Sequence, residues 1–193
     1  MKNSIWKQIR ERLPAAELHI YGAYPTQQIL ELHNEKEGFL VKGYVSSPEE
    51  VVRNTKVVLA PLRFGAGIKG KLTEAMVFGT PSVTSSIGAE GMHGQLPWNG
   101  FVNDDFEDFA QKAVAIYTDE KLWVAAQENG VAIINTHYDK EKNGALLIDK
   151  IINIQENFPQ HRIANFLGSM LQHQTLQSTK YMSKWIEAKN RLH

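Results

Sequence analysis

Residues 57–91 read VVLAPLRFGAGIKGKLTEAMVFGTPSVTSSIGAEG, and this stretch decides the fold. The apolar run from Val57 to Leu62 predicts a β-strand, and the turn Phe64-Gly65-Ala66-Gly67 follows it directly. Behind the turn, Lys69, Lys71 and Glu74 fall on the first turns of a predicted helix.

A strand, a glycine turn and a helix in this order are typical of an anion-binding loop. Glycine allows positive φ and a close approach to a ligand, and the N-terminus of the helix attracts negative charge. No acidic residue lies between Arg63 and Lys71, so the two lysines supply roughly the countercharge of a pyrophosphate. On these residues alone, a plain strand-to-helix turn explains the glycines equally well. Lysines in such places are more often solvated helix residues, and a carboxylate like Glu74 most often favours the helix dipole.

Strands and helices alternate on both sides of this stretch. Apolar runs predict strands at residues 17–21, 39–45, 57–62, 82–85 and 101–103. Helical spacing predicts helices at residues 4–13, 26–34, from 47 onward, 69–78, 104–117, 118–135 and 139–154. Asn3 or Ser4 is expected to cap the first helix and Thr26 the second, while Asp104 and Asp105 start the fifth. The alternation predicts an α/β fold, with a parallel sheet, helices on both faces and ligands at the carboxyl ends of the strands.

Composition narrows the class of protein further. Lys and Arg number 21 and so do Asp and Glu, so no overall charge favours nucleic acid or an anionic membrane. The absence of cysteine excludes disulfides and thiolate zinc sites. The N-terminus lacks the apolar core of a signal peptide, and no apolar run approaches the ~20 residues that span a bilayer. We therefore expect a cytoplasmic protein, and an acceptor held at a membrane surface stays open.

The composition changes at Phe158-Pro159, which predicts a domain over residues 1–158 and a helical tail over residues 159–193. Residues 160–193 carry five basic residues against one acid, Glu187. Tyr181, Trp185, Ala188 and Leu192 form one stripe of a basic helix. Such a helix either folds onto its own domain or binds a surface of another polypeptide.

The motifs at residues 61–76, 79–83 and 88–91 resemble the carboxyl-terminal, nucleotide-sugar-binding domain of the GT-B glycosyltransferases, group 1 (family 4). The likeness covers about Leu18 to Ile152, and the tail resembles the terminal helix that in this fold crosses back to the amino-terminal domain. The resemblance implies a Rossmann-like domain that binds the donor of a retaining, metal-independent hexosyltransferase. It further implies a nucleoside-diphosphate-sugar as donor, no cofactor, and a role in polysaccharide or glycan biosynthesis.

The resemblance also implies roles for single residues. The loop from Phe64 through Ala66 to Gly67 would lie beside the donor diphosphate. Lys71 would neutralise the diphosphate and act in catalysis on the leaving group, and Lys69 would assist it. Glu74 would accept hydrogen bonds from the ribose hydroxyls, because one carboxylate accepts two at once.

Two further parts of the chain would border the donor. The backbone around Tyr44 and Val45 would lie beside the base, and Glu90, in the Gly88-Ala89-Glu90-Gly91 loop, would either face the donor or hold its own loop. The seven histidines show no metal-ligand spacing, and no Ser-His-Asp arrangement is defined.

The chain departs from the family pattern in two ways. Many relatives carry a first glutamate seven residues before the second, and Ala66 stands at that place here. The partner Rossmann domain is missing, as is a first strand expected before Ser4, so we expect a fragment that is inactive alone. A stand-alone nucleotide-binding or protein-interaction module is the alternative, and a related epimerase is weaker because its acid/base residues cannot be located.

Overall fold

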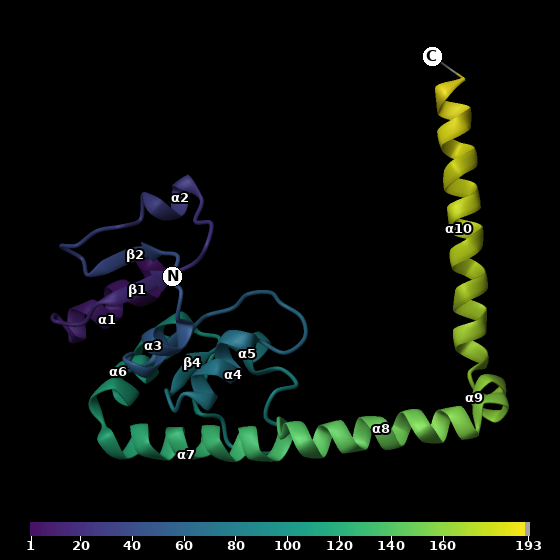
Figure 1. Cartoon of the computed structure of the whole chain (residues 1–193). Helices are drawn as coiled ribbons and strands as arrows, with labels where there is room; N and C mark the ends of the chain where they lie inside the picture. Colours follow the sequence, from purple (N-terminus) through teal and green to yellow (C-terminus); the bar gives the residue numbers. More distant parts are fainter. Residues whose placement is uncertain (192–193) are drawn as a thin grey trace. The chain divides into compact units, whose positions relative to one another are not determined.

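The computed structural model describes residues 1–191, without the side chains of residues 171–176. Leu192, the last member of the predicted stripe, therefore lies outside the described residues. The chain divides into two compact units, Met1–Asp139 and Lys140–His193 (Figure 1). Phe158-Pro159, where the composition changes, lies at the start of a helix inside the second unit.

The first unit contains two parallel sheets. One pairs β1 (Leu18–Tyr21) with β2 (Phe39–Gly43), and the other has the order β3-β4-β5, formed by Val58–Ala60, Ser82–Thr84 and Gly100–Val102. Leu59 lies opposite Val83, which lies opposite Phe101. The predicted α/β class with parallel strands is confirmed. The expected single sheet is, however, divided into a two-stranded and a three-stranded sheet.

Helices connect these strands and cover the sheets. They are η1 and α1 (Lys2–Trp6 and Lys7–Arg12), α2 (Gln27–Leu30), α3 (Pro48–Arg53), α4 (Gly70–Val77), α5 (Ser86–Ala89), α6 (Phe106–Thr118) and α7 (Glu120–His137). The short helix α5 was not predicted. Two apolar cores result: η1 and α1 pack against α6 over Phe39 and Val83, and α4 packs against α7 around Leu72 and Ile133.

Capping residues in the sequence match three helix starts. Ser47 accepts a hydrogen bond from the N–H of Glu50, and Asp105 and Asp119 each accept two from the first turns of α6 and α7. Each such cap satisfies N–H groups that have no partner within the helix. At its carboxyl end, α4 stops in the common way, with a glycine in the left-handed conformation: Gly79 has φ +76°.

The structure corrects two predicted helices. The helix expected over residues 26–34 ends at Leu30, and the Thr26 side chain does not cap it. The chain leaves the helix because Asn34 and Phe39 exchange two backbone hydrogen bonds, of 2.8 and 3.0 Å, around Gly38. At the N-terminus the first turn is a π-helix that begins at Lys2, so neither Asn3 nor Ser4 caps it.

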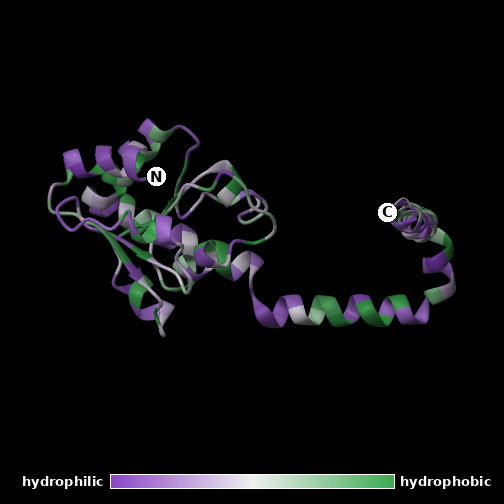
Figure 2. Ribbon diagram, turned by 90° about the horizontal axis from the view of Figure 1, so that it is seen from above, coloured by the Kyte–Doolittle hydropathy of each residue, from purple (hydrophilic) through white to green (hydrophobic). Residues whose placement is uncertain are grey.

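The second unit consists of helices α8 (Lys140–Glu156), α9 (Phe158–Ala164) and α10 (Phe166–Asn190). None of its described residues is buried, and apolar side chains of α8 such as Leu147 and Ile151 are about half exposed, at 61% and 47%. Figure 2 shows green, hydrophobic segments along α8. Of the helices in the described residues, none has the length and hydropathy needed to cross a bilayer.

Candidate functional site

The glycine loop leaves the carboxyl end of β3 and lies at the surface. Residues 63–68 are all exposed, and the Phe64 side chain is 83% exposed. Gly67 has φ +66°, which turns the backbone in a way that L side chains rarely adopt. The chain then enters α4, so the predicted order of strand, glycine turn and helix is present.

Lys69, directly after this loop, is a buried charged residue. It is the N-cap of α4, with extended backbone angles of φ −89° and ψ 94°, and its side chain is only 8% exposed. Its chain lies against the loop, because a Cβ added at Gly65 would stand 3.9 Å from its Cε. Its ammonium group is buried and, among the described residues, has no hydrogen-bond partner. Burying an ammonium without a partner is costly, so this group favours an anion beside it.

The first turn of α4 reinforces this preference. It contains no acidic residue, and its first N–H groups have no partner within the helix. Lys71 is the second residue of α4 and is exposed, and Glu74, three residues later on the same side of the helix, is exposed too. The loop, the buried ammonium of Lys69 and the positive end of the helix dipole therefore lie next to one another.

Hydroxyl groups join the ends of neighbouring strands below the loop. Thr84 donates to the carbonyl of Ala60 at 2.8 Å, and Ser85 donates to the carbonyl of Leu62 at 2.5 Å. Ser85 also accepts a bond from the N–H of Gly88. Gly88 has to be glycine, because a Cβ there would lie 1.9 Å from the Thr84 hydroxyl. These contacts attach the segment after β3 to the segment after β4.

A cavity of about 360 Å³ opens at the carboxyl ends of β3, β4 and β5. Five apolar residues line it together with five polar or charged ones, which are Arg63, Ser85, Ser86, Asn103 and Asp104. None of the residues predicted for the site is among them. Asp104 does not begin α6 as a cap. It accepts a hydrogen bond of 2.8 Å from the N–H of Ser86 instead, and so connects the β5 end to α5. The sequence held no signal for this contact, because the two residues are 18 positions apart.

This contact predicts a small dependence of stability on pH. Hydrogen bonds from the side chain and backbone of Ser86 hold the pKa of Asp104 below its ordinary value. A lowered carboxyl pKa stabilises the fold above the unfolded pKa, and this contribution is lost as pH falls through the folded value. We expect the urea midpoint of the wild-type chain to fall more steeply below about pH 4 than that of Asp104→Asn. Parallel midpoint curves for the two proteins would contradict this assignment.

The other predicted site residues lie elsewhere in the first unit, both before and after the glycine loop in the chain. Tyr44 and Val45 follow the end of β2, with Tyr44 73% exposed, and no described hydrogen bond or ring contact joins them to the glycine loop. Glu90 follows the last residue of α5 and is exposed. The structure therefore brings Lys69 to the loop. It leaves Tyr44 and Glu90 exposed and Val45 half-buried, without a described contact to the loop.

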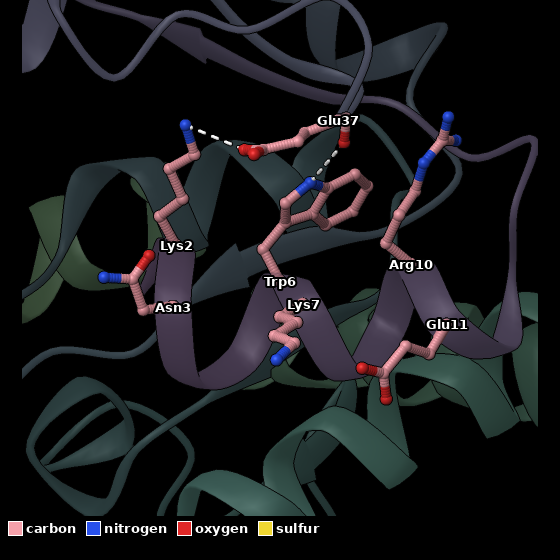
Figure 3. A pocket seen from close by; sticks show the side chains of 7 residues that line it. All are labelled: Lys2, Asn3, Trp6, Lys7, Arg10, Glu11 and Glu37. Atoms are coloured by element: carbon pink, nitrogen blue, oxygen red, sulfur yellow. Dashed lines mark hydrogen bonds and ion pairs between the residues drawn. The ribbon is translucent and has the colours of Figure 1, made fainter.

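A larger cavity, of about 560 Å³, lies on the surface of η1 and α1 (Figure 3). The polar groups of Lys2, Trp6 and Glu37 in this cavity are bonded within the fold. Lys2 donates to the carbonyl of Leu32 at 2.8 Å and pairs with Glu37 at 2.9 Å, and the Trp6 indole donates to the Glu37 carbonyl at 2.8 Å. In Figure 3 these side chains point toward one another, while Lys7 and Glu11 point away. We assign this cavity to the fold and not to the site.

Parallel strands between helices, with a glycine loop at the carboxyl end of β3, define a Rossmann-like α/β unit. The model of the glycosyl transferases group 1 family matches residues 3–119. The chain belongs to this family, and its fold is that of a GT-B glycosyltransferase domain. No curated protein sequence matches it significantly.

Solved structures show the same fold. The chain is similar to TarM of S. aureus, solved as a variant in a complex with fondaparinux, α-GlcNAc-glycerol and UDP, with a TM-score of 0.64 and 21% sequence identity. A second crystal structure of TarM gives the same TM-score and identity. The match covers 78% of this chain but only 31% and 30% of the two TarM chains. The chain thus spans less than a third of their length.

Proposed function

We propose that this chain is the donor-binding half of a retaining, metal-independent glycosyltransferase of the hexosyltransferase type. It binds a nucleoside-diphosphate-sugar, and its partner half supplies the acceptor site. The observation that carries the proposal is the buried ammonium of Lys69, which has no described partner beneath a glycine loop and beside the N-terminus of α4. Family membership supports sugar transfer, and UDP in the TarM complex supports a nucleoside diphosphate as the ligand.

The loop and the two lysines have distinct tasks in this proposal. The backbone of residues 64–67 and the first turn of α4 direct N–H groups at the phosphate oxygens. Lys69 supplies a buried positive charge, and Lys71, exposed on the first turn, reaches the diphosphate from solvent. As the bond between the anomeric carbon and the diphosphate oxygen breaks, negative charge grows on the leaving diphosphate. These groups then bind the diphosphate more strongly in the transition state than in the ground state. This difference lowers the activation free energy of sugar transfer.

Glu74 is proposed to bind the ribose. Its carboxylate lies one helical turn beyond Lys71 and accepts hydrogen bonds from two vicinal hydroxyls. A charged hydrogen bond contributes about 1.5–3 kcal/mol, so Glu74→Ala is expected to weaken UDP binding about tenfold or more. Isothermal titration of the 193-residue chain with UDP and GDP measures this loss.

The matched control for Glu74 is Glu128→Ala, an exposed carboxylate in the middle of α7. Its titration should equal that of the wild-type chain. If no nucleoside diphosphate binds, or if both variants lose affinity equally, the donor-binding role is wrong. Binding without any transfer, even when a separate amino-terminal Rossmann domain is added, would favour the alternative of a stand-alone nucleotide-binding module.

A further inference from the structure

The cavity of about 360 Å³ at the carboxyl ends of β3, β4 and β5 is separate from the residues proposed to bind the donor. None of residues 64–69 lines it, and α4 contributes no wall. Its helical wall comes instead from α6, through Phe106 and Phe109. Its volume falls in the range of about 300–1,000 Å³ that is usual for small-molecule sites. The cavity is therefore a candidate site of its own.

Polar side chains reach this cavity from three connections of the sheet. Arg63 follows β3, and Ser86 begins α5 after β4. Asn103 and Asp104 follow β5. The N–H of Asn103 donates to the carbonyl of Thr84 at 2.8 Å, and this bond joins two of the connections. The N–H of Ser86 joins the same two by donating to Asp104. These backbone segments are therefore held in place before a ligand arrives.

These side chains retain capacity for further hydrogen bonds. Arg63 is exposed, and its guanidinium has no hydrogen bond or ion pair within the described residues. Asp104 binds Ser86, but a carboxylate has about four acceptor positions, so positions remain for a ligand. The side-chain oxygen of Asn103 accepts a bond of 3.0 Å from the N–H of Asp105, so its amide N–H groups are left to donate. The cavity thus offers a ligand both donors and acceptors.

The charges in the wall favour a neutral ligand. Arg63 and Asp104 are the charged residues that line the cavity, one of each sign. A cation would be repelled by Arg63 and an anion by Asp104, so a net charge of either sign gains little. A hydroxyl group both donates and accepts, and neighbouring hydroxyls therefore bond to a carboxylate and a guanidinium together. The wall thus selects a neutral ligand that carries several hydroxyls.

An aromatic ring adds an apolar surface to this polar wall. Phe106, the first residue of α6, lines the cavity and is 43% exposed. The face of an aromatic ring is negative and attracts C–H groups, which a pyranose presents on its own ring face. A nucleobase is also flat and neutral, but its polar groups lie on its edge alone. Polar groups from three strand ends fit hydroxyls that are distributed around a sugar ring.

We propose that this cavity binds a neutral pyranose of a glycan. Its hydroxyls donate to Asp104 and accept from Arg63 and Asn103, while its C–H face packs on Phe106. Binding of the sugar does not depend on the donor site. Its use in transfer rests on the proposed function, in which the pyranose belongs to the acceptor glycan. Arg63 directly precedes the glycine loop, so a glycan held here extends toward the donor.

The test is an NMR titration of the isotope-labelled 193-residue chain with maltose, cellobiose and diacetylchitobiose. We expect the disaccharide that binds best to shift the amide signals of Ser86, Asn103 and Asp104 in a saturable way, and to leave Lys69 unchanged. Asp104→Ala removes a charged acceptor and should weaken this binding about tenfold or more. Phe106→Ala should weaken it as well, and because Phe106 is partly exposed, this variant tests the site even if Asp104→Ala lowers stability.

The matched control is Asp108→Ala, an exposed carboxylate on the first turn of α6 that does not line the cavity. It should bind the disaccharide as the wild-type chain does. Equal loss in this control, or no saturable shift with any of the three disaccharides, overturns the proposal. Shifts at the same amides with uridine alone also overturn it, because the cavity then binds a base.

Two further titrations separate this proposal from the donor site. UDP-glucose should leave disaccharide binding unchanged, and displacement of the disaccharide would overturn the proposal, because the cavity then holds the donor sugar. If UDP does not bind while a disaccharide does, the donor-binding role fails and the pyranose site stands.

Discussion

Lys69→Met is expected to weaken UDP binding by about ten- to a hundredfold and to make the ligand-free chain more stable. A hydrogen bond to a charged group contributes about 1.5–3 kcal/mol, and each 1.4 kcal/mol changes affinity about tenfold. Without ligand, the buried ammonium has no described partner, so methionine of similar length removes a desolvation cost of about 1–3 kcal/mol or more. Calorimetric titration and thermal melting of the same variant measure the two effects.

The opposite signs of these effects make the test specific. A lysine that serves only the fold would lose stability and affinity together when it is replaced. The matched control is Lys121→Met, an exposed lysine on the first turn of α7, which should change neither quantity. Unchanged UDP affinity in Lys69→Met, or a lower melting temperature, would remove the main support for the anion site.

Gly100→Ala is expected to prevent the first unit from folding stably. Gly100 has φ +139°, and a Cβ there would lie 2.1 Å from the carbonyl oxygen of Ser82, a backbone atom of the paired strand. The clash cannot be relieved by a rotamer change, so β5 has to move away from the fully buried strand β4. Strain and lost packing of this kind amount to about 4 kcal/mol or more. Circular dichroism and urea unfolding should show a lost or strongly lowered transition.

Gly144→Ala is the matched control, because Gly144 lies within α8 and an added Cβ meets nothing within 4 Å. Alanine favours a helix over glycine by about 1 kcal/mol, so this variant should be as stable as the wild-type chain or more so. A Gly100→Ala protein that melts within a few degrees of wild type would show that β5 is not held against β4 as described.

Local patterns in the sequence predicted most of the first unit. Some features depend only on residues a few positions away, so the sequence shows them directly. They are the glycine loop, the cap residues Ser47 and Asp119, and Gly79 at the end of α4. The predicted length of the helix that ends at Leu30 was too great, because the backbone bridge between Asn34 and Phe39 outweighs helix propensity. The division of the sheet depends on which strands lie side by side, and no local pattern records that.

The two lysines show the same limit in the candidate site. Family resemblance favours Lys71 as the main cation, and its role stays a prediction. The structure adds that Lys69, at the cap position, has extended backbone angles that place its side chain against Gly65. Residues two apart on a helix point in different directions, so the register of the helix start decides which lysine lies below the loop. A shift of one residue in that register is beyond what composition and spacing can resolve.

The hydroxyl bonds from Thr84 to Ala60 and from Ser85 to Leu62 affect how a ligand binds. They attach the start of the connection after β3 to the end of β4, so the strand ends beneath the proposed anion site have little conformational freedom left to lose. A site of this kind is pre-organised, and its affinity depends on the partner groups themselves and not on ordering a flexible segment. Its association rate should then be set by diffusion and charge, without a slow rearrangement step.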